Sequence, residues 1–393
     1  PWSSSSIING YKTKIQDYFS TNSHGKFTLP TITVAPLTTL SENATYYTAK
    51  QNWKGVQYDG HVVLLLESEE LGQGTTDYNP DNFDFVCLVI NHELYDWAGL
   101  GEVAGKFNWI NGSNSGNGLD QTVDTYIHEL GHNLGLYHAN AWDPTSTTQA
   151  DDSAGSQVGY GYDFDMMGNL SWSYNYDQKH YSSSAKAKLT WLPWDNIASV
   201  NSNYSGRIYA MDHTLMPGRK YALRVGVDAT LGSATGLDYW LEHRSRFPTN
   251  THAANGAFIF TSDQAPDQNA SDGAINLLDM NPATATVNDA GLQAGQSFTD
   301  RSGRWKIEIT AQGGTGANSW VDVTVTDNDL PAITVQPADA VVAKDAAHTL
   351  RVTATGTGLT YQWRKNSVDI PGATNPTYVI GKFVATDQAN YDV

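Results

Sequence analysis

The feature that most constrains this chain is an eleven-residue stretch, from His128 to His138, that holds three histidines. In a helix, His128 and His132 project from one face about one turn apart, so two imidazole nitrogens can bind one metal. Gly135 offers the left-handed conformation that ends a helix, and the chain can then turn back to bring His138 to the same metal. Glu129 lies between the first two histidines, close to a metal's water but offset from the ligands. The spacing predicts a zinc site with three histidine ligands, an open fourth position and Glu129 as general base.

The stretch resembles the signature of the metzincin zinc peptidases, and residues 160–168 resemble the turn with a methionine that this family carries beneath the metal. In this turn Met167 precedes Gly168. The sequence departs from the family at Tyr162, where an acidic residue is expected. The resemblance is closest to the gametolysin-like branch and covers residues 5–328, with matching segments at 97–101, 109–112, 138–140, 165–168, 239–244 and 277–282. It implies an α+β catalytic domain with a mixed sheet and a zinc helix, and hydrolysis of peptide bonds.

A glycine-rich segment, residues 97–112, directly precedes the predicted zinc helix. In a metzincin this position is an edge strand onto which the peptide substrate pairs by strand addition. The resemblance therefore implies substrate-binding residues in this strand and after the methionine turn, namely Gly99, Leu100, Gly101, Glu102, Val103, Asn169, Leu170, Ser171 and Trp172. An ordinary glycine-rich hairpin is the alternative interpretation. His92 is a competing metal ligand, which we leave out because the ligand set is complete without it.

Hydrophobic patterns divide the chain into three predicted domains: the catalytic domain at 1–196, a β-sandwich at 197–328 and an immunoglobulin-like β-sandwich at 331–393. The first domain shows helical patterns at 5–20, 61–71, 119–134 and 182–192, β patterns at 27–40 and 84–90, and a long loop at 139–160. The second shows short β runs at 221–227, 238–244, 257–261, 305–310 and 320–326.

The last domain resembles an immunoglobulin-like fold through Trp363, expected in its core, and Tyr391, expected at a tyrosine corner. Val352 and Val393 stand where that fold often has two cysteines. The stretch is shorter than the seven strands of such a sandwich require. We therefore expect the closing strand to lie beyond Val393, so that the domain in this chain is incomplete.

Composition excludes several classes of partner. A net charge of −18 argues against a nucleic acid or an anionic membrane surface. No apolar run is long enough to span a bilayer. The one cysteine, Cys87, lies in an apolar run and is expected to be a buried strand residue. The low charged fraction, the many small polar residues and the β modules are typical of an exported, extracellular bacterial protein. The chain begins at Pro1, which is consistent with a removed leader.

Two weaker sites are open. Asp263, Asp267 and Asp272 form a weak calcium candidate, because the even spacing of a strong calcium loop is missing. Four aromatic residues could contact a glycan or a cell surface, although core packing is the simpler interpretation: Tyr239, Trp240, Trp305 and Trp320.

The sequence therefore predicts a secreted zinc endopeptidase that acts on extracellular proteins or peptides through Glu129. Two alternatives stay open. One is an exported binding or adhesion protein that keeps the metal site without turnover. The other is a zinc hydrolase of a different amide, such as a cell-wall crosslink.

Overall fold

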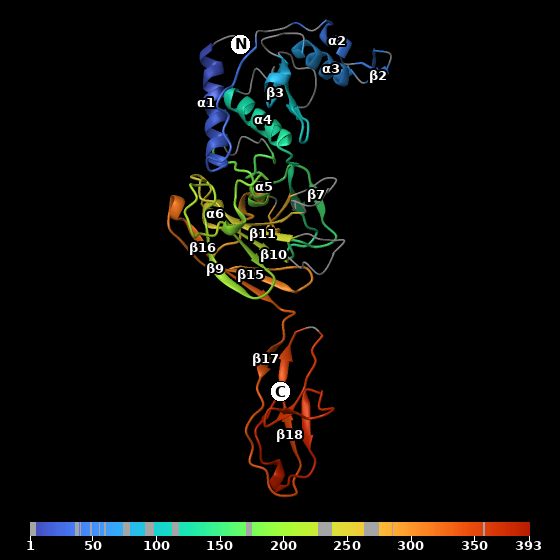
Figure 1. The fold of residues 1–393 in the computed structure, drawn as a ribbon, viewed down its shortest axis with the longest axis vertical. Coiled ribbons are helices and arrows are strands. Elements are labelled where there is room, and N and C mark those ends of the chain that lie inside the picture. The colour runs from blue at the N-terminus through green and yellow to red at the C-terminus, as the bar shows by residue number, and fades with distance from the viewer. Residues whose placement is uncertain are drawn as a thin grey trace.

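The computed structural model describes residues 5–35, 39, 41–47, 49–54, 56–58, 60–73, 79–90, 98–111, 118–169, 175–226, 238–262, 275–284, 286–356 and 358–393. Helices gather at one end of the long axis, two large β-sheets occupy the middle, and a C-terminal β module lies beyond them at the other end (Figure 1). The fold is thus a mixed α+β structure with additional β-sheet regions.

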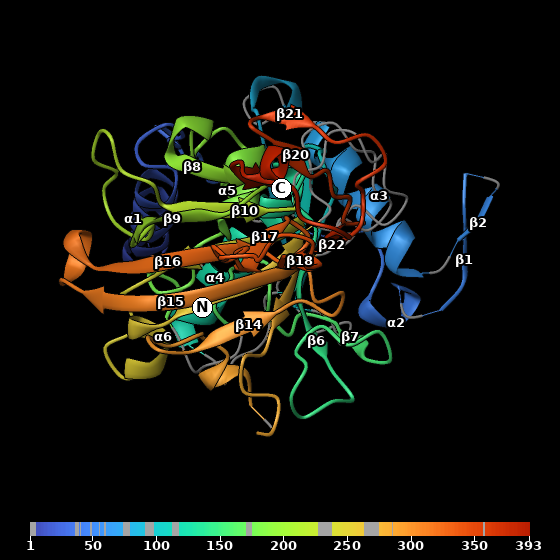
Figure 2. The same cartoon turned by 90° about the horizontal axis from the view of Figure 1, so that it is seen from below.

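The N-terminal part contains four helices and two small sheets: α1 (Ser5–Asn22), α2 (Ala44–Tyr47), β1 (Gln51–Trp53), β2 (Val56–Tyr58), α3 (Gly60–Gln73), β3 (Val86–Ile90), β4 (Gly99–Gly101), β5 (Phe107–Asn111) and α4 (Gly118–Asn133). The β1–β2 hairpin projects at the periphery (Figure 2). In the other sheet, β5 lies between β3, which is parallel to it, and β4, which is antiparallel. Among the described strands, β4 is therefore an edge strand.

The helices α1, α3 and α4 and the strand β3 lie where the hydrophobic patterns predict them, whereas the short helix α2 was not predicted. The β pattern at 27–40 does not form a strand in its described residues. Pro30 lacks the backbone N–H that a ladder needs, which favours the irregular conformation. Cys87 lies in β3 as expected, although its side chain is half-buried rather than fully buried. Of the helices that the structure describes, none is both long and apolar enough to cross a membrane.

A seven-stranded sheet forms the middle of the molecule, in the order β7 (Ser156–Val158), β6 (Ala139–Asp143), β13 (Ile275–Leu278), β12 (Ala257–Ser262), β11 (Asp238–His243), β10 (Ala222–Val225) and β8 (Ile197–Val200). A four-stranded sheet packs on it, in the order β14 (Ser297–Thr299), β15 (Trp305–Gly313), β16 (Trp320–Asp327) and β9 (Tyr204–Tyr209). Two short helices, α5 (Ser183–Lys188) and α6 (Thr251–Asn255), lie in the connections. The β runs predicted after residue 197 are present as strands.

The seven-stranded sheet buries both of its faces. In β11 and β12, Trp240 and Phe258 face a core that includes residues of α1 and α4, whereas Leu241 and Ile259 face a second core shared with β15 and β16. Because side chains alternate between the faces of a strand, successive apolar residues serve two different cores. The helices α1 and α4 and the four-stranded sheet therefore pack on opposite faces of one common sheet.

The segment 139–160, which the sequence presents as a long loop, instead supplies two strands of this sheet. β6 pairs in parallel with β13 across a long sequence separation, and β7 pairs antiparallel with β6. A short strand whose pairing partner is distant in sequence need not show the alternation of apolar and polar residues by which a strand is predicted. The sheet thus draws strands from both sides of residue 196, and the domain boundary at that position stays a prediction.

The C-terminal module holds three small sheets built from β17 (Ala332–Val335), β18 (His348–Arg351), β19 (Thr353–Thr355), β20 (Arg364–Lys365), β21 (Val368–Asp369), β22 (Thr377–Ile380) and β23 (Tyr391–Asp392). Its core contains the fully buried Trp363, with Val352, Tyr391 and Val393 packed in the same cluster. A single segment near residue 330 joins it to the rest of the chain (Figure 1).

Candidate metal centre

The helix α4 carries two histidines of the predicted site on one side and an apolar row on another. Val123, Ile127 and Leu130 are fully buried in the core, at the three- and four-residue spacing of a helix face. This packing fixes the rotation of α4, so His128 and His132 point together toward the same place. Their ring centroids lie 5.0 Å apart.

The helix ends as its glycine predicts. Gly135 has a φ of +90°, and its N–H donates to the carbonyl of His132 at 2.7 Å. The N–H of Leu136 then donates back to the carbonyl of Gly131 at 3.0 Å. These bonds satisfy the last carbonyls of the helix and reverse the chain. His138 is thereby brought beside His132, with 3.1 Å between their Nε2 atoms.

The three histidines present one ring nitrogen each to a common point, and these atoms all lie within 4.8 Å of one another. His128 Nδ1 donates to the carbonyl of Met166, and His132 Nδ1 donates to the carbonyl of Leu136, both at 2.8 Å. Because a carbonyl oxygen can only accept, each of these rings keeps its proton on Nδ1 and leaves the Nε2 lone pair free. Burial is the largest cause that lowers the pKa of all three histidines, for His138 to about 4.

This donor set fits zinc. A tetrahedral zinc with bonds of 2.0–2.1 Å holds its ligand nitrogens about 3.3 Å apart, close to the separation of His132 and His138. Neutral imidazoles whose other nitrogen donates to a carbonyl are the usual form of a zinc ligand. His128, His132 and His138 could therefore bind a metal.

Glu129 lies beside the histidines and is 5% exposed. Burial raises the pKa of its carboxyl to about 8. A pKa in this range lets the carboxyl group exchange a proton close to neutral pH.

The edge strand β4 passes directly over Glu129. A Cβ atom at Gly99 would lie 2.5 Å from Glu129 Oε1, and one at Gly101 would lie 2.6 Å from the Glu129 carbonyl oxygen. The glycines of this strand therefore let it approach α4 closely. Leu100 and Val103 are exposed, at 40% and 42%. Glu102 instead closes the β4–β5 turn, because its Oε2 accepts the N–H groups of residues 106 and 107 at 3.0 Å.

The methionine turn lies against the other side of α4. Met167 is buried, its N–H donates to Asp165 Oδ1 at 2.8 Å, and its carbonyl accepts from Ala139 at 2.9 Å. A Cβ atom at Gly131 would overlap Met167 Sδ, and one at Gly168 would overlap the carbonyl of Tyr162. The methionine turn therefore requires a glycine at position 131 of the helix, because any larger side chain there would occupy the space of Met167.

Tyr162, where the family leads us to expect an acid, is fully buried and belongs to a polar network beneath the turn. Its hydroxyl donates to Glu242 Oε1 at 2.9 Å, and the N–H of Ser183 donates to Glu242 Oε2 at 2.6 Å. Arg244 Nε donates to Glu242 Oε1 at 2.7 Å. Its Nη1 also donates to the carbonyls of residues 164 and 180. An acidic side chain is therefore placed beside Tyr162 by β11, about 80 residues away in sequence.

Tyr160 was not among the predicted site residues, yet it lies against the histidines. Its ring centroid is 4.0 Å from that of His138 and 6.0 Å from that of His128. Its side chain is 43% exposed. Burial and the charge of Glu129 raise the pKa of its hydroxyl. Nothing in the sequence Gly159-Tyr160-Gly161 indicates that the tyrosine lies against the histidines.

Other predicted residues lie elsewhere or outside the described part of the chain. Asn169 is exposed, and its carbonyl accepts from Lys179 Nζ at 2.9 Å. The structure does not describe Leu170, Ser171, Trp172 and His92, nor the calcium candidate with Asp263, Asp267 and Asp272. Within the described residues, the histidine triad is the one cluster of three or more such side chains that could hold a metal ion, so calcium finds no support.

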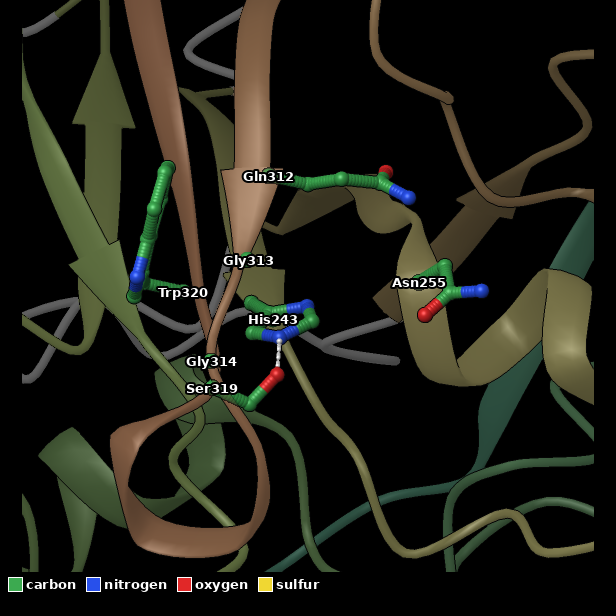
Figure 3. Close-up of a pocket in the computed structure, with 7 residues that line it drawn as sticks. All are labelled: His243, Asn255, Gln312, Gly313, Gly314, Ser319 and Trp320. Carbon is green, nitrogen blue, oxygen red and sulfur yellow. Dashed lines mark hydrogen bonds between the residues drawn. The ribbon is translucent and has the colours of Figure 1, made fainter.

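A separate cavity of about 140 Å³ opens beside β15 and β16, lined by His243, Asn255, Gln312, Gly313, Gly314, Ser319 and Trp320 (Figure 3). His243 Nδ1 donates to the carbonyl of Gly256 at 2.8 Å, so its Nε2 accepts from the Ser319 hydroxyl at 2.7 Å. These bonds join the end of β11 to the residues that directly precede β12 and β16. The Arg207 guanidinium lies 3.5 Å from the ring centroid of Trp320, so one face of that ring is covered. Trp240 and Trp305 are buried, as expected of core aromatics.

The comparisons with known proteins agree with the histidine triad. The family model of the reprolysin-like metallo-peptidases of family M12B matches residues 31–139. The matched segment contains Glu129 and all three histidines of the triad. No curated protein and no solved structure matches the chain.

Proposed function

We propose that this chain is a secreted zinc-dependent endopeptidase of the gametolysin-like branch of the metzincins. One observation carries the proposal. The ring nitrogens of His128, His132 and His138 lie close together beside the buried carboxyl group of Glu129, under the edge strand β4. The family match to a metallopeptidase over residues 31–139 supports a peptide or protein as substrate.

In this proposal His128, His132 and His138 hold the zinc through Nε2. When bound, zinc lowers the pKa of water and polarises the scissile carbonyl. Glu129 takes a proton from the attacking water and delivers it to the leaving amine, so its carboxyl group ends the cycle as it began. Met167 forms an apolar floor under the helix and limits the access of bulk water from that side.

The substrate is proposed to pair with the free edge of β4. An extended peptide that adds to this edge passes over Glu129, because Gly99 and Gly101 lie directly against that side chain. Substitution of either glycine would push the strand away from the helix and displace the peptide. The exposed Leu100 and Val103 are then placed to contact substrate side chains.

The C-terminal module is proposed to be immunoglobulin-like and to act as a spacer or adhesion unit. Its support is the buried Trp363, the packing of Val352 and Val393 in one cluster, and the Tyr391 hydroxyl, which donates to the carbonyl of Asp387 at 3.1 Å as a tyrosine corner does. The module supplies none of the residues of the histidine triad.

The test uses the purified chain with a quenched fluorescent peptide mixture and an unfolded protein substrate. Elemental analysis should find about one zinc per chain. Glu129→Gln should keep the zinc and lose about 10²–10⁴-fold in turnover, because only the base is removed. His132→Ala should lose both zinc and turnover.

Glu308→Gln serves as the matched control, because Glu308 lies on β15 in an exposed ion pair with Lys306 at 2.9 Å. Its activity should equal that of the unaltered chain. A fully active preparation without a transition metal, or a Glu129→Gln variant within a few-fold of normal, would refute the proposal. Cleavage of cell-wall crosslinks without cleavage of any peptide would favour the hydrolase of another amide.

A further inference from the structure

Tyr160 has an unusual backbone conformation for a large side chain. Its φ is +60°, and the N–H of Gly161 donates to the carbonyl of Val158 at 3.1 Å, so Tyr160 is the third residue of a tight turn. A positive φ at that position favours glycine or asparagine. For other residues such strain costs on the order of 1 kcal/mol and tends to persist at functional sites.

The surroundings of Tyr160 hold this conformation in place. Its N–H donates to Asn140 Oδ1 at 2.8 Å, and Asn140 lies on β6, two residues after His138. A Cβ atom at Gly161 would lie 2.7 Å from the Cβ atom of Ala141, so the turn is pressed against β6. The strand that follows the third histidine therefore also positions the tyrosine.

The Tyr160 side chain is only partly buried, with 43% of it exposed. Within the part of the chain that the structure describes, its hydroxyl has no hydrogen-bond partner. The contacts that it does make are with the site: the ring lies on His138 and near His128, and the Glu129 carboxylate acts on the hydroxyl through space.

Two of the three ligand rings have their other ring nitrogen engaged. The Nδ1–H groups of His128 and His132 donate to backbone carbonyls, and Glu129 is the proposed base rather than a donor. These groups are therefore not free to donate to a tetrahedral oxyanion beside the triad, whereas Tyr160, on the turn that leads to the methionine, offers a hydrogen-bond donor in addition to the charge stabilisation that zinc would supply. A hydrogen-bond donor fixed in advance where charge develops stabilises the transition state more than the bound substrate.

We propose that the Tyr160 hydroxyl donates a hydrogen bond to the oxyanion that forms when water attacks the scissile carbonyl. This inference rests on the proposed peptidase function. The proton stays on the tyrosine oxygen throughout: the new bond joins the water oxygen to the carbonyl carbon, Glu129 carries the transferred proton, and the carbon–nitrogen bond breaks. The strained turn then holds the tyrosine ring beside His138 and His128.

The experiment compares Tyr160→Phe, which removes only the hydroxyl, with Tyr160→Leu, which also removes the ring. Tyr137→Phe is the matched control, because Tyr137 is next to His138 in sequence but its ring lies 5.5 Å from Lys188 Nζ, outside the triad. Tyr160→Phe should lower kcat by about 10–100-fold, somewhat less than the loss of a sole oxyanion donor. KM and zinc content should stay within about two-fold, and Tyr160→Leu should lose at least as much activity.

Two binding measurements provide a readout that does not depend on turnover. A phosphinic peptide, whose tetrahedral anion mimics the transition state, should bind Tyr160→Phe more weakly by about the same factor as kcat/KM falls. An ordinary substrate peptide should bind Glu129→Gln and the double variant Glu129→Gln/Tyr160→Phe equally, because the ground-state carbonyl does not need the donor.

Each contrary result is distinct. A Tyr160→Phe variant with kcat within three-fold of normal would overturn the inference and leave the peptidase proposal intact, since Glu129→Gln would still be inactive. Equal weakening of both ligands, or loss of zinc, would assign Tyr160 to substrate or metal binding and also overturn it. If the unaltered chain cleaves no peptide, the proposed function itself fails.

Discussion

Arg244→Met tests whether the buried ion pair of β11 supports the methionine turn. Arg244 is fully buried, and its guanidinium donates to Glu242 and to the carbonyls of Phe164 and His180, the last at 3.0 Å. Phe164 lies in the turn before Met167, and His180 follows the turn. One side chain therefore joins the central sheet to both ends of the segment that carries Met167.

The expected loss follows from these contacts. Removal of one partner of a buried ion pair costs about 3–5 kcal/mol, because Glu242 would remain charged with only Tyr162 and Ser183 as donors. Each of the two orphaned carbonyls adds about 1 kcal/mol. The total, about 5–7 kcal/mol, is a large part of the free energy of unfolding of a typical domain. Zinc should also be lost more easily, because the Met166 carbonyl that orients His128 lies in the released segment.

The double variant Arg244→Met/Glu242→Gln provides the internal control. A glutamine at 242 can accept from the Ser183 N–H and donate to the Tyr162 oxygen, and it leaves no unpaired charge. It should recover at least about 2 kcal/mol of the loss. Urea denaturation followed by tryptophan fluorescence, with zinc measured after dialysis, gives both quantities. The reasoning is refuted if Arg244→Met loses less than about 1 kcal/mol, or if the double variant is less stable than the single one.

Two further predictions concern stability and domain organisation. Burial lowers the pKa of the fully buried Lys186 from 10.5 to about 7. Between about pH 7 and pH 10.5 the folded state therefore binds fewer protons than the unfolded state, so the free energy of unfolding should rise with pH over this range. Lys186→Met should raise the free energy of unfolding by up to about 4 kcal/mol at pH 6.5 and by little at pH 10. Urea denaturation measures this, with the exposed Lys306→Met as control. A lower free energy of unfolding for Lys186→Met at pH 6.5 would contradict the prediction. A chain that ends at residue 328 should cleave a small peptide at a rate within about two-fold of the full chain, because the C-terminal module supplies none of the proposed metal ligands, base or pairing strand. If cleavage is abolished while zinc stays bound, the module contributes to catalysis and the prediction is wrong.

The sequence is most informative where the determinant is local. The histidines on α4 are related by one helical turn, and Gly135 reverses the chain within three residues of His138, so their meeting follows from spacing alone. The partner of Tyr162 is different in kind. Glu242 reaches Tyr162 across 80 positions, and no local pattern connects them. Tyr160 is hidden for another reason: its role depends on a positive φ that glycine would adopt more easily, so propensity argues against it.

The same distinction explains why the sequence of residues 139–160 predicts a loop although the segment forms two strands. Ala139–Asp143 has no alternation, yet it becomes a strand because β13 offers it a parallel partner and its side chains enter the core. That pairing sets the position of His138, which immediately precedes β6, and of Asn140, which holds Tyr160. The third histidine, the tyrosine and the acid beneath the methionine turn are thus all positioned by one seven-stranded sheet. It follows that the β region after residue 196 contributes to the metal centre, and a fragment that ends at 196 would lack the strands that hold the third ligand in place.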